Sequence, residues 1–418
     1  MWGSIRQLGL AGVLATTALI NAGAHADDPV RAGLFAPLTG PAARTGQEIK
    51  NGAEMAIEDA RAAGELPVIV DGKERDIELI PVDSESTPEK AIRAFQDAVA
   101  RNHVEVMLNG WHGSISLSMI DVEADANIIH FGDLGAPEDI ANKINEKHYT
   151  HWFKGWPAPR TMSGLYVDAV ESFIKDGAWK PQKKRAVIVA EDTDWGRTWT
   201  DAIAKRLTET GWEVMSSDFV RMDESEFGPL LTKYKALGAT LIAATLGPVP
   251  SVSFVKQHYD AGLKGLLIAD GLGWSADWHQ KTGGAADYVI SMDSPRVITP
   301  EQREWTRRYQ EKFGIAPPPA SAGQAYDYTR MFVKGLKQAG TLDKAKLSDA
   351  LLNLEYTGIW HHYAFAKKAG DHAISPYEVK VGPFMKGFSF PMVQYMGDKA
   401  QIIWPADYAQ AKFQAPGE

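Results

Sequence analysis

The segment GLFAPLTGPAARTGQEIKNGAEMAIEDARAAG, residues 33–64, contains the unit from which the fold is built. Its apolar start predicts a short strand, and a loop with two glycines follows that strand. In residues 46–64, Ile49, Ala53 and Ile57 recur at the spacing of one helix face, and a glycine closes the stretch. The segment therefore predicts a strand, a loop and an amphipathic helix in that order.

The same strand-then-helix unit recurs in two runs. The first run ends near residue 133, and the second extends from RAVIVAEDTDWG, residues 185–196, to about residue 273. The next part, about residues 297–355, is mainly helical, and the tail from Trp360 has the character of strands and loops. Repeated strand–helix–strand units favour parallel sheets with helices on both faces. The sequence therefore predicts an α/β protein with two doubly wound, Rossmann-like lobes.

The N-terminus has the pattern of a secretory signal. Residues 1–26 contain one arginine, an apolar run from Leu8 to Ile20, and small residues around His25. The apolar run is shorter than the roughly 20 residues that span a bilayer. We therefore expect cleavage near Ala26 and export to the periplasm.

Length, cysteine content and charge narrow the class of protein further. Without residues 1–26 the chain keeps 392 of its 418 residues, which exceeds the roughly 250–300 residues at which single cores stop growing. The chain has no cysteine, so disulfides, thiol catalysis and thiolate metal sites are excluded. The formal net charge of −9 argues against nucleic-acid binding, which requires a basic face.

Glycine-containing loops follow the predicted strands, at the positions where open α/β sheets bind ligands. They span residues 38–46, 109–114, 131–137, 191–197, 246–250 and 270–274. Four tryptophans lie in or near these loops, namely Trp111, Trp156, Trp195 and Trp274. Aromatic walls are typical of small-molecule pockets, although tryptophans can also cover an interface between lobes. Loops of this kind in both halves favour a cleft lined by both lobes.

The sequence offers little support for catalysis. His112 and Ser114 in LNGWHGSISLS, residues 108–118, could suggest a hydrolase, but the G-x-S-x-G elbow is missing. Triads also bring the base from a distant segment. Neither H-E-x-x-H nor a glycine-rich phosphate motif occurs at a strand end. We therefore expect a protein that is not an enzyme and uses no metal or cofactor.

Three stretches resemble the type I periplasmic solute-binding proteins of ABC transporters, the branched-chain amino acid (Leu/Ile/Val) binding family. They are residues 33–64, AEDTDWGRTWTDAIAKRLTETGWEV at 190–214, and SAGQAYDYTRMFVKGL at 321–336. The resemblance implies two lobes that are joined by a hinge of three crossovers and close on a small ligand.

The resemblance also implies how the chain divides between the lobes. Residues 28–150 and 297–357 are expected in lobe I. Residues 151–293 and the tail, 358–418, are expected in lobe II.

Ligand contacts follow from the same resemblance, with Trp156 added because it lies near the boundary between the lobes. The expected ligand-binding residues are Trp111, His112, Gly113, Ser114, Gly132, Asp133, Leu134, Trp156, Trp195, Pro248, Asp270 and Gly271. Relatives that bind amino acids place a carboxylate near the last loop to meet the ammonium. Here the aligned position is Gly271, and on a strand end the neighbouring Asp270 faces the other side. This departure indicates an altered specificity.

The expected function is therefore that of the solute-binding component of an ABC importer. The protein would act as a monomer, capture a small polar or aromatic solute (an amino acid, amide or carboxylate) and deliver it to a membrane ABC permease. If His112 is protonated, it and Ser114 could both donate to a ligand carboxylate. Tryptophan side chains can also bind a quaternary amine by cation–π contacts, so this ligand class is an alternative. A periplasmic sensor that feeds a membrane receptor and an exported hydrolase are the alternatives.

Overall fold

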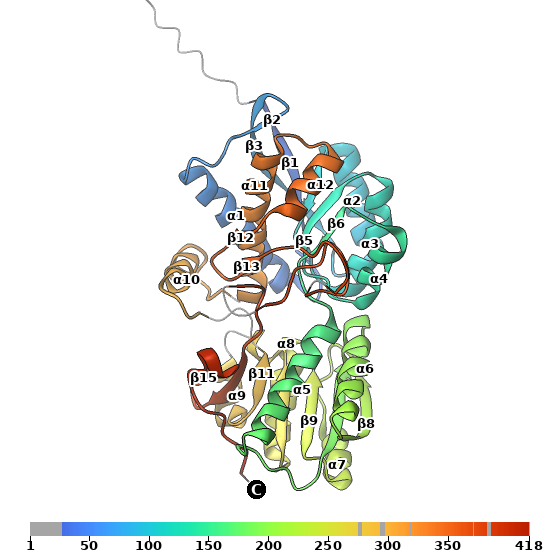
Figure 1. Cartoon of the computed structure of the whole chain (residues 1–418), viewed down its shortest axis with the longest axis vertical. Helices are drawn as coiled ribbons and strands as arrows, with labels where there is room; N and C mark the ends of the chain where they lie inside the picture. The colour runs from blue at the N-terminus through green and yellow to red at the C-terminus, as the bar shows by residue number, and fades with distance from the viewer. Residues whose placement is uncertain are drawn as a thin grey trace, which may run out of the picture.

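The computed structural model describes residues 27–274, 278–292, 297–317, 319–370, 372–382 and 386–417. The expected signal segment, residues 1–26, lies outside this described part. The chain forms two α/β lobes that follow one another along the long axis of the molecule (Figure 1). The predicted α/β class with two Rossmann-like lobes is confirmed.

The first lobe is built on a six-stranded sheet with the order β2-β3-β1-β4-β5-β6. Neighbouring strands are parallel, except that β2 and β3 form an antiparallel hairpin. The strands are β1 Asp27–Ala36, β2 Val68–Val70, β3 Lys73–Asp83, β4 Val106–Leu108, β5 Ile129–Asp133 and β6 Trp152–Lys154.

Helices from two parts of the sequence cover this sheet. The N-terminal ones are α1 Ala43–Ala62, α2 Pro88–Asn102, α3 Gly113–Asp125 and α4 Glu138–Lys147. The later ones are α11 Gln324–Ala339 and α12 Lys344–Asn353, whereas α10 Pro300–Phe313 packs against α1 through Trp305 and Tyr309. In α1 the predicted stripe of Ile49, Ala53 and Ile57 is buried, so the helical spacing is confirmed. α11 lies beside α1 (Figure 1), although the two are far apart in the sequence.

The second lobe contains a seven-stranded sheet with the order β15-β14-β11-β10-β9-β7-β8. The strands from β7 to β11 are parallel, and β14 and β15 are antiparallel additions at one edge. They are β7 Arg185–Glu191, β8 Glu213–Val220, β9 Leu241–Thr245, β10 Leu266–Asp270, β11 Ile290–Met292, β14 Met392–Met396 and β15 Lys399–Trp404. Its helices are α5 Pro159–Lys175, α6 Asp194–Glu209, α7 Gly228–Leu237, α8 Pro248–Asp260 and α9 Trp278–Thr282.

In both sheets the order of the strands reverses at an equivalent place. β1 lies between β3 and β4 in the first sheet, and β7 lies between β8 and β9 in the second. In such sheets, ligands bind outside the carboxyl ends of the strands, at the point where the strand order reverses. The topology therefore selects the loops after β1, β4, β7 and β9 as candidate ligand loops.

The C-terminal part of the chain contributes to both lobes. A small hairpin, β12 Tyr356–Thr357 and β13 His362–Tyr363, precedes a segment that lies against the first sheet. There, Glu378 pairs with Lys154 of β6, and the ring of Phe365 lies 5.4 Å from that of Phe131. β14 and β15 then join the second sheet. The contacts therefore differ from the expected assignment of all of residues 358–418 to lobe II, because aromatic side chains of this segment fill space beside β5.

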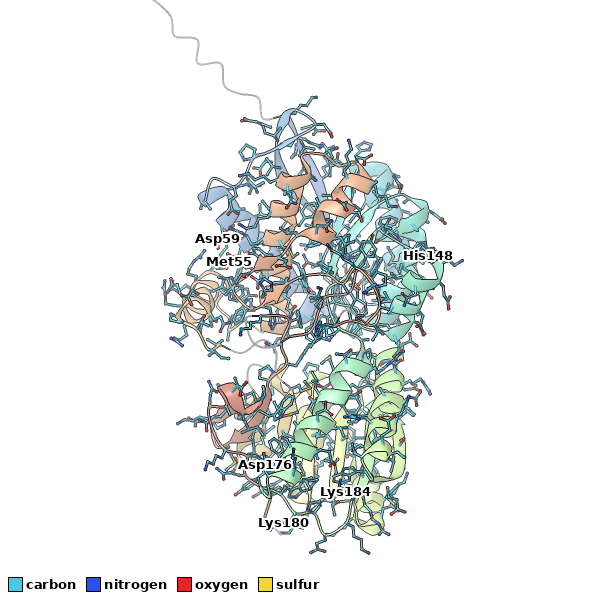
Figure 2. The ribbon with its side chains drawn as sticks, in the orientation of Figure 1. Met55, Asp59, His148, Asp176, Lys180 and Lys184 are labelled. Carbon is cyan, nitrogen blue, oxygen red and sulfur yellow. The ribbon has the colours of Figure 1, made fainter. Side chains whose placement is uncertain are left out.

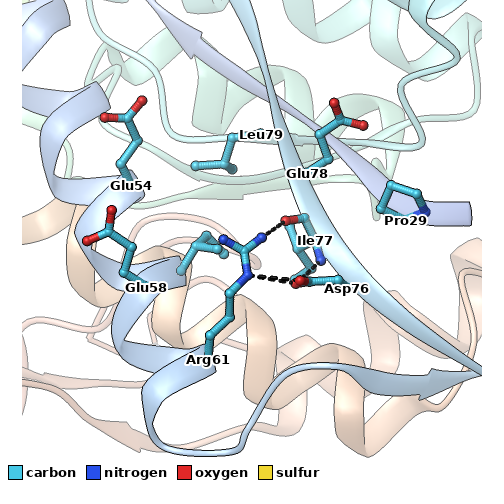
Figure 3. A pocket seen from close by; sticks show the side chains of 9 residues that line it. Pro29, Glu54, Glu58, Arg61, Asp76, Ile77, Glu78 and Leu79 are labelled. Carbon is cyan, nitrogen blue, oxygen red and sulfur yellow. Dashed lines mark hydrogen bonds and ion pairs between the residues drawn. The ribbon is translucent and has the colours of Figure 1, made fainter. Parts of the chain in front are cut away.

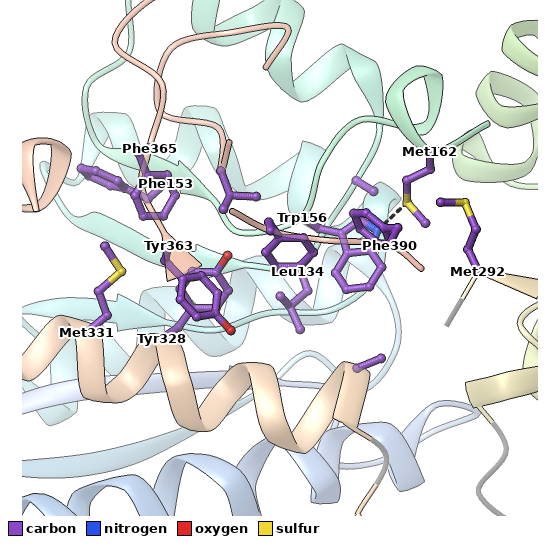
Figure 4. Packing of buried hydrophobic residues seen from close by; sticks show 14 of the residues in the cluster. Leu134, Phe153, Trp156, Met162, Met292, Tyr328, Met331, Tyr363, Phe365 and Phe390 are labelled. Carbon is purple, nitrogen blue, oxygen red and sulfur yellow. Dashed lines mark hydrogen bonds between the residues drawn. The ribbon is translucent and has the colours of Figure 1, made fainter. Parts of the chain in front are cut away.

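The chain crosses between the lobes three times, after β6, after β11 and before β14. Apolar side chains continue from one lobe to the other at these crossings (Figure 4). Leu134, Trp156, Met162, Met292 and Phe390 belong to one buried cluster. The hinge is thus part of a hydrophobic core. Among the described helices, none is both long and apolar enough to span a membrane.

Candidate functional site

The loop after β4 has an unusual backbone. Asn109, Gly110 and His112 have φ values of 64°, 148° and 77°. For Asn109 and His112 such values are uncommon and cost of order 1–3 kcal/mol each, and strain of this kind clusters at functional sites. Two hydrogen bonds fix the loop to its neighbours. The backbone amide of Asn109 donates to the Phe131 carbonyl (3.0 Å), and the Asn109 side chain donates to Thr329 (3.3 Å).

The same loop presents polar and aromatic groups at the start of α3. Ser114 is exposed, and Trp111, His112 and Gly113 are half-buried. Among the described residues, no side chain caps the start of α3, and the first turn of this helix contains no acid. The first N–H groups of a helix lack partners within it and attract negative charge. The loop can therefore donate hydrogen bonds to a polar or anionic group.

His112 is neutral at physiological pH. Burial lowers its pKa to about 4, so the condition of a protonated imidazole is not met at neutral pH, and the neutral ring keeps one N–H donor. Among the hydrogen bonds of the described residues, none joins His112 to Ser114, and no group of three or more potential metal ligands is found.

Asp133 lies inside the first lobe. It is completely buried and accepts hydrogen bonds from Ser116 of α3 (2.9 Å) and from the amide of Gly135 (3.0 Å). Burial raises its pKa to about 6, against the opposing effects of His130 and of these two donors. In the structure, Asp133 braces the loops after β4 and β5 from within.

Its neighbours Gly132 and Leu134 are also buried. Gly132 has a φ of 78°, and a Cβ there would lie 2.6 Å from the ring of Tyr328. Trp156 is 3% exposed, donates to the sulfur of Met162 (3.1 Å) and packs edge-on against Phe390 (Figure 4). The structure therefore places Gly132, Leu134 and Trp156 in the core near the hinge, whereas Ser114 is exposed.

On the second-lobe side, the expected aromatic contact is Trp195. It lies in the first turn of α6, is half-buried, and donates its indole N–H to Thr245 (3.0 Å) at the end of β9. This bond fixes the ring from below. One part of the ring remains accessible, as required of an aromatic wall.

Beneath Trp195, a chain of hydrogen bonds reaches the hinge. Thr245 donates to one oxygen of Asp270 (2.9 Å), and the hydroxyl of Tyr166 in α5 donates to the other (2.7 Å). The Tyr166 hydroxyl also accepts from the amide of Met292 (2.6 Å), the last residue of β11. The sequence did not single out Tyr166 or Thr245. Thr245 could have been found because it ends a strand, whereas Tyr166 lies mid-helix and carries no such signal.

The remaining expected residues lie in the loops after β9 and β10. Pro248 begins α8 and is half-buried, and Val249 beside it is 71% exposed. Gly271 has a φ of 95°, and a Cβ there would lie 2.1 Å from the carbonyl oxygen of Leu246. This position requires glycine for the backbone itself. Nothing is described for the side chain of Trp274.

A separate hollow of about 700 Å³ lies on the outside of the first lobe, between α1 and β3 (Figure 3). Four carboxylates and Arg61 line it, and Arg61 is bound to Asp76 (2.8 Å) and to the Ile77 carbonyl (2.9 Å). None of the loop residues discussed above contributes to this hollow.

Comparisons with known proteins agree with this architecture. Residues 29–380 match the sequence model of a family described as periplasmic binding protein. A Brucella suis relative named Leu/Ile/Val-binding protein homolog 7 is 22% identical, over 81% of this chain and 84% of that protein. The structure of a putative branched-chain amino acid ABC transporter from Silicibacter pomeroyi superposes with a TM-score of 0.79 at 21% identity, covering 93% of this chain and 99% of that one.

A solute-binding protein of an ABC transporter from R. palustris, solved in complex with benzoate, is a further structural neighbour. It superposes with a TM-score of 0.71 at 19% identity, covering 93% of this chain and 97% of that one. At such identities the structural likeness establishes the fold.

Proposed function

The chain belongs to the periplasmic binding protein family, and from this premise we propose that it is the solute-binding component of an ABC importer. It would be exported, bind a small polar or aromatic solute between its lobes, and deliver the solute to a membrane ABC permease as a monomer. The observation that carries the proposal is the strained, partly exposed loop after β4, which lies at a point of strand reversal where ligands bind.

Each lobe contributes a different kind of contact in this proposal. From the first lobe, Ser114, the neutral His112 and the start of α3 hold the polar end of the solute. From the second lobe, Trp195 stacks on its apolar part, since Thr245 already holds the indole in place. Contacts from both lobes stabilise the closed state relative to the open one, and this difference drives closure.

The buried residues of the expected set have a supporting role. Asp133, Gly132 and Gly271 shape the loops, and Leu134 and Trp156 pack at the hinge. The relative named as a Leu/Ile/Val-binding protein and the benzoate complex indicate two ligand classes for this site, amino acids and aromatic carboxylates.

A thermal-shift screen across amino acids, amides, aromatic acids and quaternary amines tests the proposal. A solute that binds only the native state raises the midpoint of unfolding, so at least one class should do so in a saturable manner. If no small solute shifts the midpoint, the proposal fails. Turnover of esters or amides that is lost in Ser114→Ala would instead favour the hydrolase.

With a ligand in hand, variants test the site. His112→Ala and Trp195→Ala should each weaken binding at least about tenfold, which corresponds to roughly 1.4 kcal/mol, without unfolding the protein. His148→Ala is the matched control, because His148 also has a positive φ of 54° but lies on the outer side of the first lobe (Figure 2). Unchanged affinity in both site variants, measured by calorimetry, would refute the assignment.

A further inference from the structure

Carboxylates end four of the described strands. Asp83 ends β3, Asp133 ends β5, Glu191 ends β7 and Asp270 ends β10. Because these strands are parallel within each sheet, all four acids lie at the carboxyl ends of the strands, where the candidate ligand loops begin. A solute with an ammonium group would require a carboxylate from such a position.

In the first lobe, both acids serve the protein's own loops. Asp83 accepts hydrogen bonds from the amide of Leu38 (2.8 Å) and from the hydroxyl of Thr39 (2.7 Å), and so braces the loop after β1. Asp133 is completely buried and is held by Ser116 and the Gly135 amide, as described above. Both carboxylates therefore bind groups of the protein itself and not a solute.

In the second lobe, the two acids are occupied in the same way. One oxygen of Glu191 accepts from Thr193 (3.2 Å) and the other from the amide of Gly247 (3.2 Å). Asp270 has Thr245 on one oxygen and Tyr166 on the other. Each oxygen of these carboxylates therefore has a donor from the chain itself.

Exposure separates Asp270 from the surface that a solute would meet. Asp270 is 1% exposed, whereas Val249 of the neighbouring loop is 71% exposed and Trp195 is half-buried. Trp195 is bonded to Thr245, and Thr245 to Asp270. A solute on the second lobe meets the indole ring first, and the acid lies beneath it.

Two other acids follow β7. Asp192 forms an ion pair with Arg197 (2.5 Å). Asp194 lies in the first turn of α6, where the helix dipole stabilises a negative charge. Their charges are thus compensated locally.

We propose that Tyr166 and Thr245 determine the specificity of the site: by holding both oxygens of Asp270 they withdraw this carboxylate from the ligand, and the solute is an organic acid without an ammonium group. The inference rests on the proposed function. The acid group of the solute would be held by the loop of His112 and Ser114, and its apolar part by Trp195.

Matched pairs of solutes test the ligand class by calorimetry. 3-Phenylpropanoate and phenylalanine differ only in the α-ammonium group, as do 4-methylpentanoate and leucine. The amine-free member of at least one pair should bind at least tenfold more tightly than its amino acid. Equal or tighter binding of the amino acids would overturn the inference.

The same measurement separates the inference from the proposed function. If the pairs do not bind but an amide or a quaternary amine does, the ligand class is wrong and the solute-binding function stands. If no solute of any class binds, the proposed function fails, and the inference fails with it.

Variants test the two residues. Tyr166→Phe removes one donor from Asp270, so the affinity ratio between 3-phenylpropanoate and phenylalanine should fall at least fivefold through tighter binding of the amino acid. Tyr234→Phe is the control, because this buried tyrosine of the same lobe donates to Asp218 (3.0 Å) and should leave the ratio unchanged. Thr245→Val serves if Tyr166→Phe does not fold. An unchanged ratio in the folded variants would refute the role of these residues.

Discussion

At the residue scale, the loop after β4 depends on one close approach. Gly110 has a φ of 148°, and a Cβ at this position would lie 2.0 Å from an oxygen of Asp133. Gly110→Ala should therefore destabilise the protein by at least about 2 kcal/mol, since both the backbone and the buried carboxylate must move. Urea unfolding measures the change.

Gly164 provides the matched control for this substitution. It lies within α5, and a Cβ there would have no neighbour within 4 Å. Gly164→Ala should be neutral or stabilise the protein by about 0.5–1 kcal/mol, because alanine is the better helix former. If both substitutions had equal effects, the close approach at Gly110 would not limit stability.

A buried ion pair in the first lobe should make stability depend on pH. His130 and Glu123 are both fully buried, with Nδ1 and Oε2 2.9 Å apart. Burial alone would lower the pKa of His130, but the charge of Glu123 and the hydrogen bond to it outweigh burial and raise the pKa to about 9. A raised pKa contributes stability that is complete below about pH 6.5 and is lost as the pH rises to 9.

Glu123→Gln isolates this contribution. Without the carboxylate, burial dominates and the His130 imidazole stays neutral, so the variant should lose this part of the pH dependence. The difference in unfolding free energy between wild type and variant should shrink by roughly 3 kcal/mol between pH 6.5 and pH 9. Parallel stability curves for the two proteins, from urea unfolding at each pH, would contradict the assignment.

At the element scale, a second buried pair fastens the first crossover. Lys154 of β6 and Glu378 of the C-terminal segment are both fully buried, 3.2 Å apart. Glu378 also accepts from the amides of Ala158, at the start of α5 (2.6 Å), and Ile374 (2.9 Å). Lys154 donates to the carbonyl of Trp156. One carboxylate thus joins the hinge to a segment 224 residues away in sequence.

Breaking this pair should be costly. Lys154→Met leaves the Glu378 charge buried without its cation, and we expect a loss of about 3–5 kcal/mol in unfolding free energy. The double variant with Glu378→Gln should recover part of this loss. The control is Lys184→Met, because Lys184 and Glu171 form a partly exposed pair at the far end of the second lobe (Figure 2), where the cost should stay below about 1 kcal/mol. Equal costs at the two sites would contradict the proposed role of the Lys154–Glu378 pair.

Elements built from local contacts could be predicted from sequence, and those built from distant contacts could not. The apolar spacing of Ile49, Ala53 and Ile57 is sufficient to place α1. The attachment of the C-terminal segment to β6 depends on the pairing of Glu378 with Lys154, and the spacing of apolar residues cannot predict such a distant contact. The contacts of this segment with the first sheet therefore could not be predicted from the sequence.

At the scale of the whole molecule, the topology explains why the candidate loops could be located. The rule that ligands bind beyond the carboxyl ends of parallel strands needs only strand positions, which periodicity supplies. The burial of each side chain is different: Asp133 ends β5 and Ser114 lies in the first turn of α3, yet Asp133 is buried and Ser114 is exposed. That difference depends on Ser116 and Gly135, which fold back onto Asp133.

Closure of the lobes is the property that belongs to the molecule as a whole. Because the chain has no cysteine, Glu146→Cys in α4 and Asp201→Cys in α6 place two fluorescent labels on exposed sites, one in each lobe. A ligand that bridges the lobes should raise energy transfer between them with a midpoint equal to its Kd, since binding shifts the population towards the closed state. Trp195→Ala should move this midpoint to higher ligand concentration and leave the plateau unchanged, because the proposed role of the indole is to contact the ligand and not the crossovers. A pair within the second lobe, Asp201→Cys and Lys235→Cys, should show no change. Calorimetric binding without any change in transfer between the lobes would mean that the solute binds one lobe alone, and closure would have to be abandoned.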